Sequence, residues 1–504
     1  MTHKPTAEQS AIIEAARSRP ESLMISAYAG TGKTSTLEML AGAVQCENAL
    51  AVAFNTRIVK ELQSRFPPSF TMKTLNGLGH QAWSKTIGRR PYVEDRKLGK
   101  IITETLKEMN FDASMDDWDT IRRVVSAAMN SGLVPDHFKL YSNNTMVPDT
   151  EEVWQDLLLE ESLDANPALA GIARECLIRS VKASFAGTIS FDDQIYMSAL
   201  YGGKFEKYDL VLVDEAQDLS PINREQIRHC ALDRVIVVGD QRQSIYAFRG
   251  ADHRSMERLR ELRPDWLYLP LTTTFRCPKV IVEKSQEHAP GFNAFETNPE
   301  GEIISLGDWT WKEIDDIAQN RSIAVICRNN APLLSLAFKL IREGVGVAML
   351  GRDIGKNLTT LSKKIIKDDS ASAEACAILI SDWESSQKSL ALANGKENQI
   401  EGIEDRAECL RAVLEAESVN NAGDLRQRLG ELFARDRARV VLTSGHRSKG
   451  LEWPIVVHLD PWRIPSKFAK RSPTQMQQEK NLLYVIDTRT KLIQIQVSME
   501  GFTG

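Results

Sequence analysis

A run of small residues lies between a predicted strand and a predicted helix near the start of the chain. Residues 26–35 read SAYAGTGKTS, behind the apolar run LMIS and ahead of the helix-like TLEMLAGAV. Such a turn leaves backbone N–H groups pointing inward, and the helix N-terminus adds its positive dipole end. The stretch therefore predicts a phosphate-binding loop at the end of a buried strand.

The loop follows the P-loop pattern, which is Gly, four residues, then Gly-Lys-Ser/Thr. Lys33 would reach the β- and γ-phosphates of ATP, and Thr34 would place its hydroxyl on Mg²⁺. An ordinary strand-to-helix turn with a surface lysine is the alternative interpretation, because an alanine replaces the first glycine. The residues predicted to hold ATP in this loop are Ala27, Gly30, Gly32, Lys33, Thr34 and Ser35.

Composition places the chain among ordinary globular proteins. Its 504 residues suffice for roughly three or four domains, and 42% of them are hydrophobic and 26% charged. No apolar stretch approaches the ~20 residues that span a bilayer, and the N-terminus MTHKPTAEQS has no apolar signal core. We therefore expect a cytoplasmic protein with no membrane partner, associated with the nucleoid if the source is bacterial.

The net charge of −5 argues against a protein that coats nucleic acid through bulk charge. That argument is weak for motor proteins, which hold a single strand in a local groove lined by a few cations and aromatic residues. The charge balance therefore leaves a nucleic-acid partner open.

Strand-like runs indicate two α/β domains. Runs such as ALAVAF, DLVLVDEA and RVIVVGD lie before about residue 275, and SIAVIC, RVVLTS and PIVVHLD lie after about 320. Helical patterns separate them, which is typical of parallel sheets covered on both faces. We assign 1–84 and 187–275 to the first sheet domain, 85–186 to a helical insertion in it, 276–355 and 437–504 to the second, and 356–436 to a short helical insertion there.

The segment LVLVDEAQD (210–218) is a buried strand that ends in carboxylates. This arrangement suits an Mg²⁺ ion held beside a P-loop. Asp214 would bind the metal shell, and Glu215 would orient or deprotonate the attacking water. A strand end with solvated acids is the alternative.

The order of further segments resembles the UvrD/Rep/PcrA-like superfamily 1 DNA helicases, and some segments are also similar to F-box DNA helicases. After the P-loop and DEAQD come VVGDQRQSIYAFRGAD (237–252), LTTTFRCP (271–278), LTSGHRSKGLEW (442–453) and EKNLLYVIDTRTK (479–491). The resemblance implies two RecA-like P-loop domains, with ATP bound in the cleft between them.

The resemblance also implies roles around ATP. Gln9 resembles the glutamine that reads adenine, Phe275 the aromatic residue that stacks on it, and Glu452 the residue that contacts the ribose. Gln243 resembles the glutamine that senses the γ-phosphate. Arg276 and Arg489 resemble two arginine fingers, whose guanidinium groups neutralise charge that develops on the γ-phosphoryl group. For any one of these arginine or glutamine residues taken by itself, a surface salt bridge or a solvated side chain is the alternative interpretation.

The same resemblance implies contacts with single-stranded DNA. Aromatic residues stand where the family stacks bases of a single strand, and such stacking is worth ~1 to 3 kcal/mol per base. The segment ISFDDQI, which contains Asp192 and Asp193, also resembles a segment of this family, but its residues do not indicate a role. The residues predicted to contact DNA are Phe54, Thr74, Asn76, Tyr246, Phe248, Arg249 and His446.

These implications favour an ATP-dependent helicase that moves along single-stranded DNA from 3′ to 5′ and acts on tailed duplexes. The alternative is a DNA-stimulated ATPase subunit that remodels protein–DNA complexes or gates a partner nuclease without unwinding by itself. The second insertion is short for the UvrD-like pattern, and this difference could alter strand separation or its regulation. A protein partner in a repair, replication or defence complex fits either function.

Overall fold

The computed structural model divides into two compact units, residues 1–272 and 273–504, which are described separately. The boundary predicted from the sequence lies between residues 275 and 276, three residues later. The structure describes residues 4–53, 56–142, 146–162, 165–245, 255–416, 419–432, 438–467, 469 and 473–503.

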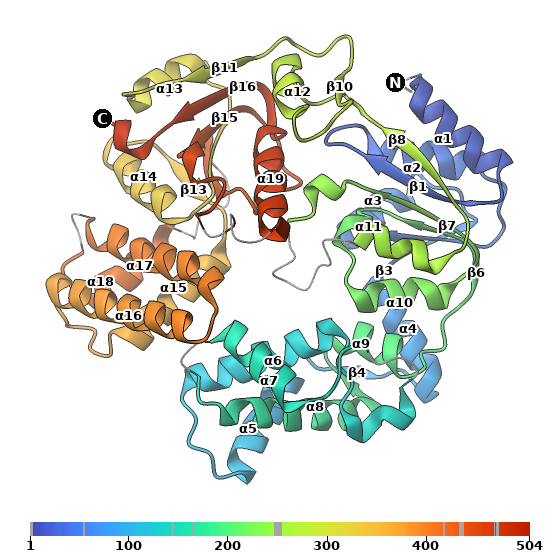
Figure 1. Ribbon diagram of the computed structural model, residues 1–504, viewed down its shortest axis with the longest axis horizontal. Coiled ribbons are helices and arrows are strands. Elements are labelled where there is room, and N and C mark those ends of the chain that lie inside the picture. Colours follow the sequence, from blue (N-terminus) through green and yellow to red (C-terminus); the bar gives the residue numbers. More distant parts are fainter. Residues whose placement is uncertain are drawn as a thin grey trace. The chain divides into compact units, whose positions relative to one another are not determined.

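Unit 1 is built on a six-stranded sheet in which every neighbouring pair of strands is parallel (Figure 1). The order across the sheet is β3-β2-β6-β7-β1-β8. The predicted parallel sheet is thereby confirmed. Its strands are β1 Ser22–Ala27, β2 Ala49–Ala53, β3 Phe70–Thr74, β6 Tyr208–Val213, β7 Ala231–Gly239 and β8 Trp266–Leu271.

Alternate residues of these strands enter two different cores. Leu23 and Ile25 of β1 pack with α1 and α2, whereas Met24 packs on the opposite face with α4, α10 and α11. Because both faces are buried, the strands are apolar throughout, as a covered parallel sheet requires. The helices beside the sheet are α1 Ala7–Ser18, α2 Lys33–Ala43, α3 Thr56–Gln63, α4 Leu75–Ile87, α10 Pro221–Cys230 and α11 Ser255–Arg258.

A helical part of unit 1 has a core of its own. This core runs beyond the predicted 85–186, because Trp83 of α4 and Tyr196 of α9 are fully buried in it. The Trp83 indole N–H donates to the carbonyl of Ser184 at 3.2 Å. Its further elements are α5 Lys97–Glu108, α6 Met115–Ser131, α7 Glu151–Glu161, α8 Ala168–Phe185, α9 Asp193–Leu200 and the paired β4 Tyr92–Val93 and β5 Thr188–Ile189.

Unit 2 contains a second six-stranded parallel sheet, in the order β11-β16-β15-β12-β14-β13. A short parallel pair, β9 Thr273–Thr274 and β10 Asn293–Ala294, precedes it in the chain. The strands of the sheet are β11 Glu302–Ser305, β12 Ile323–Cys327, β13 Val347–Met349, β14 Val440–Ser444, β15 Trp453–Leu459 and β16 Thr490–Val497.

The helical insertion of unit 2 shares one continuous core with its sheet. Val325 of β12, Leu334 of α14 and Leu410 of α17 belong to the same buried cluster. The first helix of the insertion, α15, begins at Arg352, before the predicted boundary at 356. The helices of this unit are α12 Lys279–Ser285, α13 Trp311–Ala318, α14 Ala331–Arg342, α15 Arg352–Ile365, α16 Ala373–Ala393, α17 Ile400–Leu414, α18 Ala422–Leu432 and α19 Pro473–Asp487.

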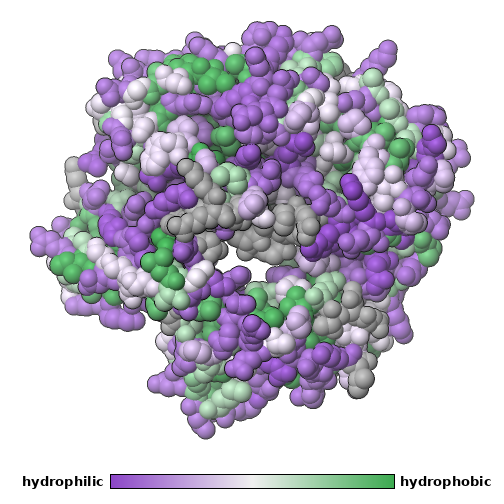
Figure 2. All heavy atoms as spheres, in the orientation of Figure 1, coloured by the Kyte–Doolittle hydropathy of each residue, from purple (hydrophilic) through white to green (hydrophobic). Residues whose placement is uncertain are grey.

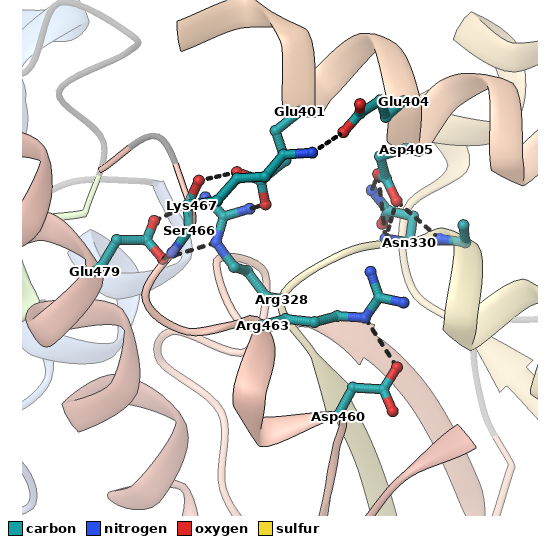
Figure 3. A network of polar contacts seen from close by, with 11 residues as sticks. Arg328, Asn330, Glu401, Glu404, Asp405, Asp460, Arg463, Ser466, Lys467 and Glu479 are labelled. Carbon is teal, nitrogen blue, oxygen red and sulfur yellow. Dashed lines mark hydrogen bonds and ion pairs between the residues drawn. The ribbon is translucent and has the colours of Figure 1, made fainter. Parts of the chain in front are cut away.

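A polar network also ties α17 to the sheet of unit 2 (Figure 3). Arg328, directly after β12, makes two hydrogen bonds of 2.8 Å to Glu479 of α19 and pairs with Glu401 of α17. Asp405 of α17 accepts hydrogen bonds from the backbone N–H groups of Asn330 and Ala331 at the start of α14. The insertion is therefore fastened to the sheet by both apolar and charged contacts.

Hydrophilic side chains cover most of the face shown in Figure 2, and hydrophobic ones are scattered among them. Within the described parts of the chain, no helix is long and apolar enough to cross a membrane.

Candidate functional site

The phosphate loop lies between β1 and α2 and has the expected strand–loop–helix geometry. Gly30 and Gly32 have φ of 70° and 76°, in the left-handed region that favours glycine. Ala27, by contrast, is the last residue of β1 and pairs with Leu271 of β8. Because extended backbone accepts any residue, alanine in place of the first glycine of the P-loop pattern introduces no backbone strain.

The start of α2 is fixed to α1 by a side chain that the sequence analysis missed. The hydroxyl of Thr36 donates to the carbonyl of Gly32 at 2.9 Å and accepts a hydrogen bond of 3.0 Å from the Gln9 amide. The other end of that amide accepts from the backbone N–H of Thr6 and closes the N-terminal cap of α1. The structure thus uses the Gln9 amide to support the loop, and adenine recognition by Gln9 stays a prediction.

Two carboxylates stand at the end of β6. The Lys33 ammonium lies 3.8 Å from a carboxylate oxygen of Glu215, and Lys33 is largely buried. Glu215 has φ of 51°, a left-handed conformation that a non-glycine residue adopts at a cost of about 1 kcal/mol or more. Burial and then the negative charge of Glu215 raise the pKa of Asp214 well above its ordinary value. The lysine and both carboxylates are therefore brought together as predicted.

A chain of hydrogen bonds joins Glu215 to Gln243. The buried Gln217 amide donates to Glu215 at 2.6 Å and accepts from the backbone N–H of Asp240 at 3.0 Å. The Gln243 amide in turn donates to the fully buried Asp240 carboxylate at 2.6 Å. Gln217 and Asp240 lie inside motifs that the sequence analysis quoted, but only their contacts reveal that they connect two assigned residues.

We call Lys33, Asp214, Glu215, Asp240 and Gln243 the P-loop site, and its donors suit Mg²⁺. Asp214 and Thr34 offer the carboxylate and hydroxyl oxygens that this ion prefers. Burial first and the charge of Glu215 second raise the pKa of Asp214, and a bound cation would stabilise its charged form. Among the described residues, no group of three or more His, Cys, Asp or Glu side chains could hold a metal ion. Mg²⁺ that binds together with phosphates usually has only one or two protein ligands, so a larger group of such side chains is not required.

The second set of predicted residues lies in unit 2. Arg276, two residues after β9, donates through Nε to the Glu452 carboxylate in the loop between β14 and β15. Lys491 of β16 donates to the other oxygen of that carboxylate at 3.0 Å. Burial raises the pKa of Glu452, but Arg276 and Lys491 outweigh it and bring this pKa below the ordinary value. Phe275 beside them is exposed, with its ring centroid 4.9 Å from that of Phe295.

Arg489 is fully buried at the start of β16. Its guanidinium donates to the carbonyls of Val485 at 2.8 Å and Leu451 at 3.1 Å, and to the Thr488 hydroxyl at 3.0 Å. In this structure Arg489 therefore bonds to its own unit, and its role as an arginine finger stays a prediction. We call Arg276, Glu452, Arg489 and Lys491 the arginine cluster.

The predicted DNA contacts are only partly within the described residues. Thr74 caps α4 by accepting from the N–H of Gly77, and Asn76 donates to the carbonyl of Phe191 at 3.0 Å. His446 is partly exposed in the turn after β14. The positions of Phe54, Tyr246, Phe248 and Arg249 lie outside the described residues.

The Asp193 carboxylate, in the segment without a derived role, is fully buried. It accepts from the Lys97 ammonium at 2.6 Å and from the N–H of Ser190 at 2.6 Å. These contacts give Asp193 a structural function, which is to join α5 to the start of α9.

Comparison with known families supplies an independent observation. A family model described as UvrD/REP helicase N-terminal domain matches residues 6–264, which is more than half of the 504 residues. The matched range contains the whole P-loop site.

Individual relatives are similar at low identity. F-box DNA helicase protein 1 of Schizosaccharomyces pombe is 24% identical, over 99% of this chain and 59% of that protein. ATP-dependent DNA helicase PcrA of Bacillus subtilis is 23% identical, over 67% of this chain and 49% of its own length. ATP-dependent DNA helicase UvrD2 of Mycobacterium tuberculosis is 23% identical, over 92% of this chain and 75% of its own length. The chain thus spans about half the length of several curated relatives it matches.

Proposed function

The chain belongs to the UvrD/REP helicase N-terminal domain family, and from this premise we propose that it is an ATP-dependent DNA helicase that moves along single-stranded DNA. The observation that carries the proposal is the P-loop site. There the largely buried Lys33 lies 3.8 Å from Glu215, and hydrogen bonds through Gln217 and Asp240 connect Glu215 to Gln243 at the ends of parallel strands.

The chain's own residues account for hydrolysis. Lys33 neutralises the β- and γ-phosphates, and the backbone N–H groups of the loop hold their oxygens. Glu215 accepts a proton from the attacking water. Its link through Gln217 and Asp240 to Gln243 keeps the base and the phosphate sensor in a fixed relation.

Mg²⁺ would be held by Thr34 and Asp214, and when bound it neutralises charge on the phosphate oxygens. Arg276 and Arg489 act on the same ATP molecule by stabilising charge that develops on the transferred phosphoryl group. Residues of both units then respond to one nucleotide. Hydrolysis can thereby be converted into movement along a strand.

The direction of travel is proposed as 3′ to 5′, and the substrates as single-stranded DNA and tailed duplexes. Support for the direction comes from the resemblance of the ordered motifs, and the names of the relatives support DNA as the substrate. DNA affinity should fall as salt rises, because phosphate contacts release counterions.

The test is strand separation by the purified chain on two duplexes that differ only in the polarity of a single-stranded tail. We expect ATP-dependent unwinding of the duplex with the 3′ tail and none with the 5′ tail. Lys33→Ala is the control, and it should abolish unwinding of both. Use of the 5′ tail alone would contradict the polarity. ATPase stimulated by DNA without unwinding of either duplex would favour the remodelling subunit.

A further inference from the structure

The Glu452 carboxylate is shared between two cations of unit 2. One oxygen accepts from Nε of Arg276, and the other accepts from the Lys491 ammonium at 3.0 Å. The three residues come from three separate segments, namely the loop after β9, the loop before β15, and β16. Since the sequence analysis assigned roles only to Arg276 and Glu452, Lys491 has no function so far.

Lys491 lies beside a local irregularity of the sheet. Trp453 of β15 pairs with Thr490 of β16, but Ile455 pairs with Ile493, so β16 has one residue more than β15 across this step. Such a bulge re-aims a side chain, and bulges are frequent beside active sites. The extra residue of β16 falls at 491–492, which places Lys491 at this irregularity of the sheet.

The contacts of Arg276 leave its phosphate-binding edge available. Glu452 engages Nε alone, and within the described residues no partner is found for the two terminal amino groups. Those two groups are the donors of a guanidinium that can grip a phosphate bidentately. A carboxylate that gripped Nε and a terminal group together would cover part of that edge.

We propose that Lys491 is a positioning residue for Arg276, acting through Glu452. By holding one carboxylate oxygen, Lys491 confines Glu452 to the Nε side of the guanidinium and keeps the terminal amino groups open to the γ-phosphate. This inference rests on the proposed ATP hydrolysis. It gives Glu452 an orienting role in addition to the ribose contact implied by resemblance.

The experiment measures steady-state ATP turnover at saturating single-stranded DNA for the wild-type chain, Lys491→Met and Lys491→Arg. Methionine keeps the length of the side chain but removes its charge, so Glu452 is released to pair with both sides of the Arg276 guanidinium. We expect kcat to fall about tenfold with KM changed less than about twofold, because a misplaced transition-state group costs rate rather than binding. Lys491→Arg should restore most of kcat.

Lys312→Met is the matched control, since Lys312 is an exposed lysine on α13 of the same unit. It should leave kcat and KM unchanged. Equal kcat in Lys491→Met and the wild-type chain would overturn the positioning role while leaving the proposed function intact. A rise in KM with unchanged kcat in Lys491→Met would also overturn the positioning role, because it would indicate that Lys491 supports only the ribose contact of Glu452. Absence of ATP turnover in the wild-type chain would overturn the proposed function and this inference with it.

Discussion

The P-loop site and the arginine cluster have opposite charge balances. In the P-loop site, one lysine faces three carboxylates, and the pKa values of Asp214 and Asp240 are raised, mainly by burial. In the arginine cluster, Arg276 and Lys491 both donate to the Glu452 carboxylate and lower its pKa against the effect of burial, and Arg489 donates to the neighbouring carbonyl of Leu451. Under the proposed function, the first region would hold Mg²⁺ and the ground-state phosphates, and the second would stabilise charge that develops during hydrolysis.

Because their charge balances differ, we expect the two regions to respond differently to mutation. Loss of a P-loop group should remove binding or the proton acceptor, whereas loss of a cluster arginine should affect rate more than binding.

Lys33→Ala is expected to have the largest effect. It removes the cation on the β- and γ-phosphates, so ATP turnover should fall by at least about 10³ and nucleotide affinity should fall as well. Turnover and the affinity for a labelled ATP analogue are measured together, with circular dichroism as the check of folding. Normal turnover would end the assignment of this loop as a P-loop.

Arg276→Ala and Arg489→Ala test the second region. Each should lower kcat by about 10³ with a smaller change in nucleotide affinity. Only Arg489→Ala should also destabilise the fold, by about 2 kcal/mol, because it strips buried carbonyls of their donor. Urea unfolding monitored beside turnover separates the two effects. Equal stability of the two variants would contradict the buried anchoring of Arg489.

Glu215→Gln should slow turnover by about 10² while ATP and Mg²⁺ still bind, since Asp214 keeps the charge at the metal and only the base is lost. Single-turnover hydrolysis with prebound ATP measures the chemical step directly. Hydrolysis at the wild-type rate would show that another group takes the proton.

A further prediction concerns the pH dependence of stability. Burial lowers the pKa of His458, on β15 in unit 2, to about 4 from 6.5. The unfolded chain then binds more protons between these values, so the contribution of His458 is present above pH 6.5 and falls by about 3 kcal/mol as pH drops to 4. Asp214 has the opposite sign, because its pKa is raised in the folded state and its protonation favours folding at lower pH.

Thermal midpoints between pH 4.5 and 7 should therefore vary less with pH in His458→Gln than in the wild-type chain. In Asp214→Asn they should fall more steeply as pH drops. Parallel curves for all three proteins would contradict the assigned pKa shifts.

Strand runs and the P-loop could be predicted from sequence because buried parallel strands are apolar throughout and the loop needs glycine at φ near 70°. The shared core of the second insertion could not be predicted, since periodicity does not tell which surface a helix covers. The roles of Thr36, Gln217 and Lys491 could not be predicted either, because their contacts depend on segments that only folding brings together. Lys491 also lies at a bulge that leaves no mark in the residue pattern.

The proposed function requires the P-loop site and the arginine cluster to respond to the same nucleotide. Hydrogen exchange of the full chain, read by mass spectrometry with and without a non-hydrolysable ATP analogue and Mg²⁺, tests this requirement most directly. The account predicts slower exchange in peptides that contain residues 27–36 and 214–217, and also in those around 275–277 and 449–452. Protection confined to the first set, at saturating analogue, would contradict this requirement.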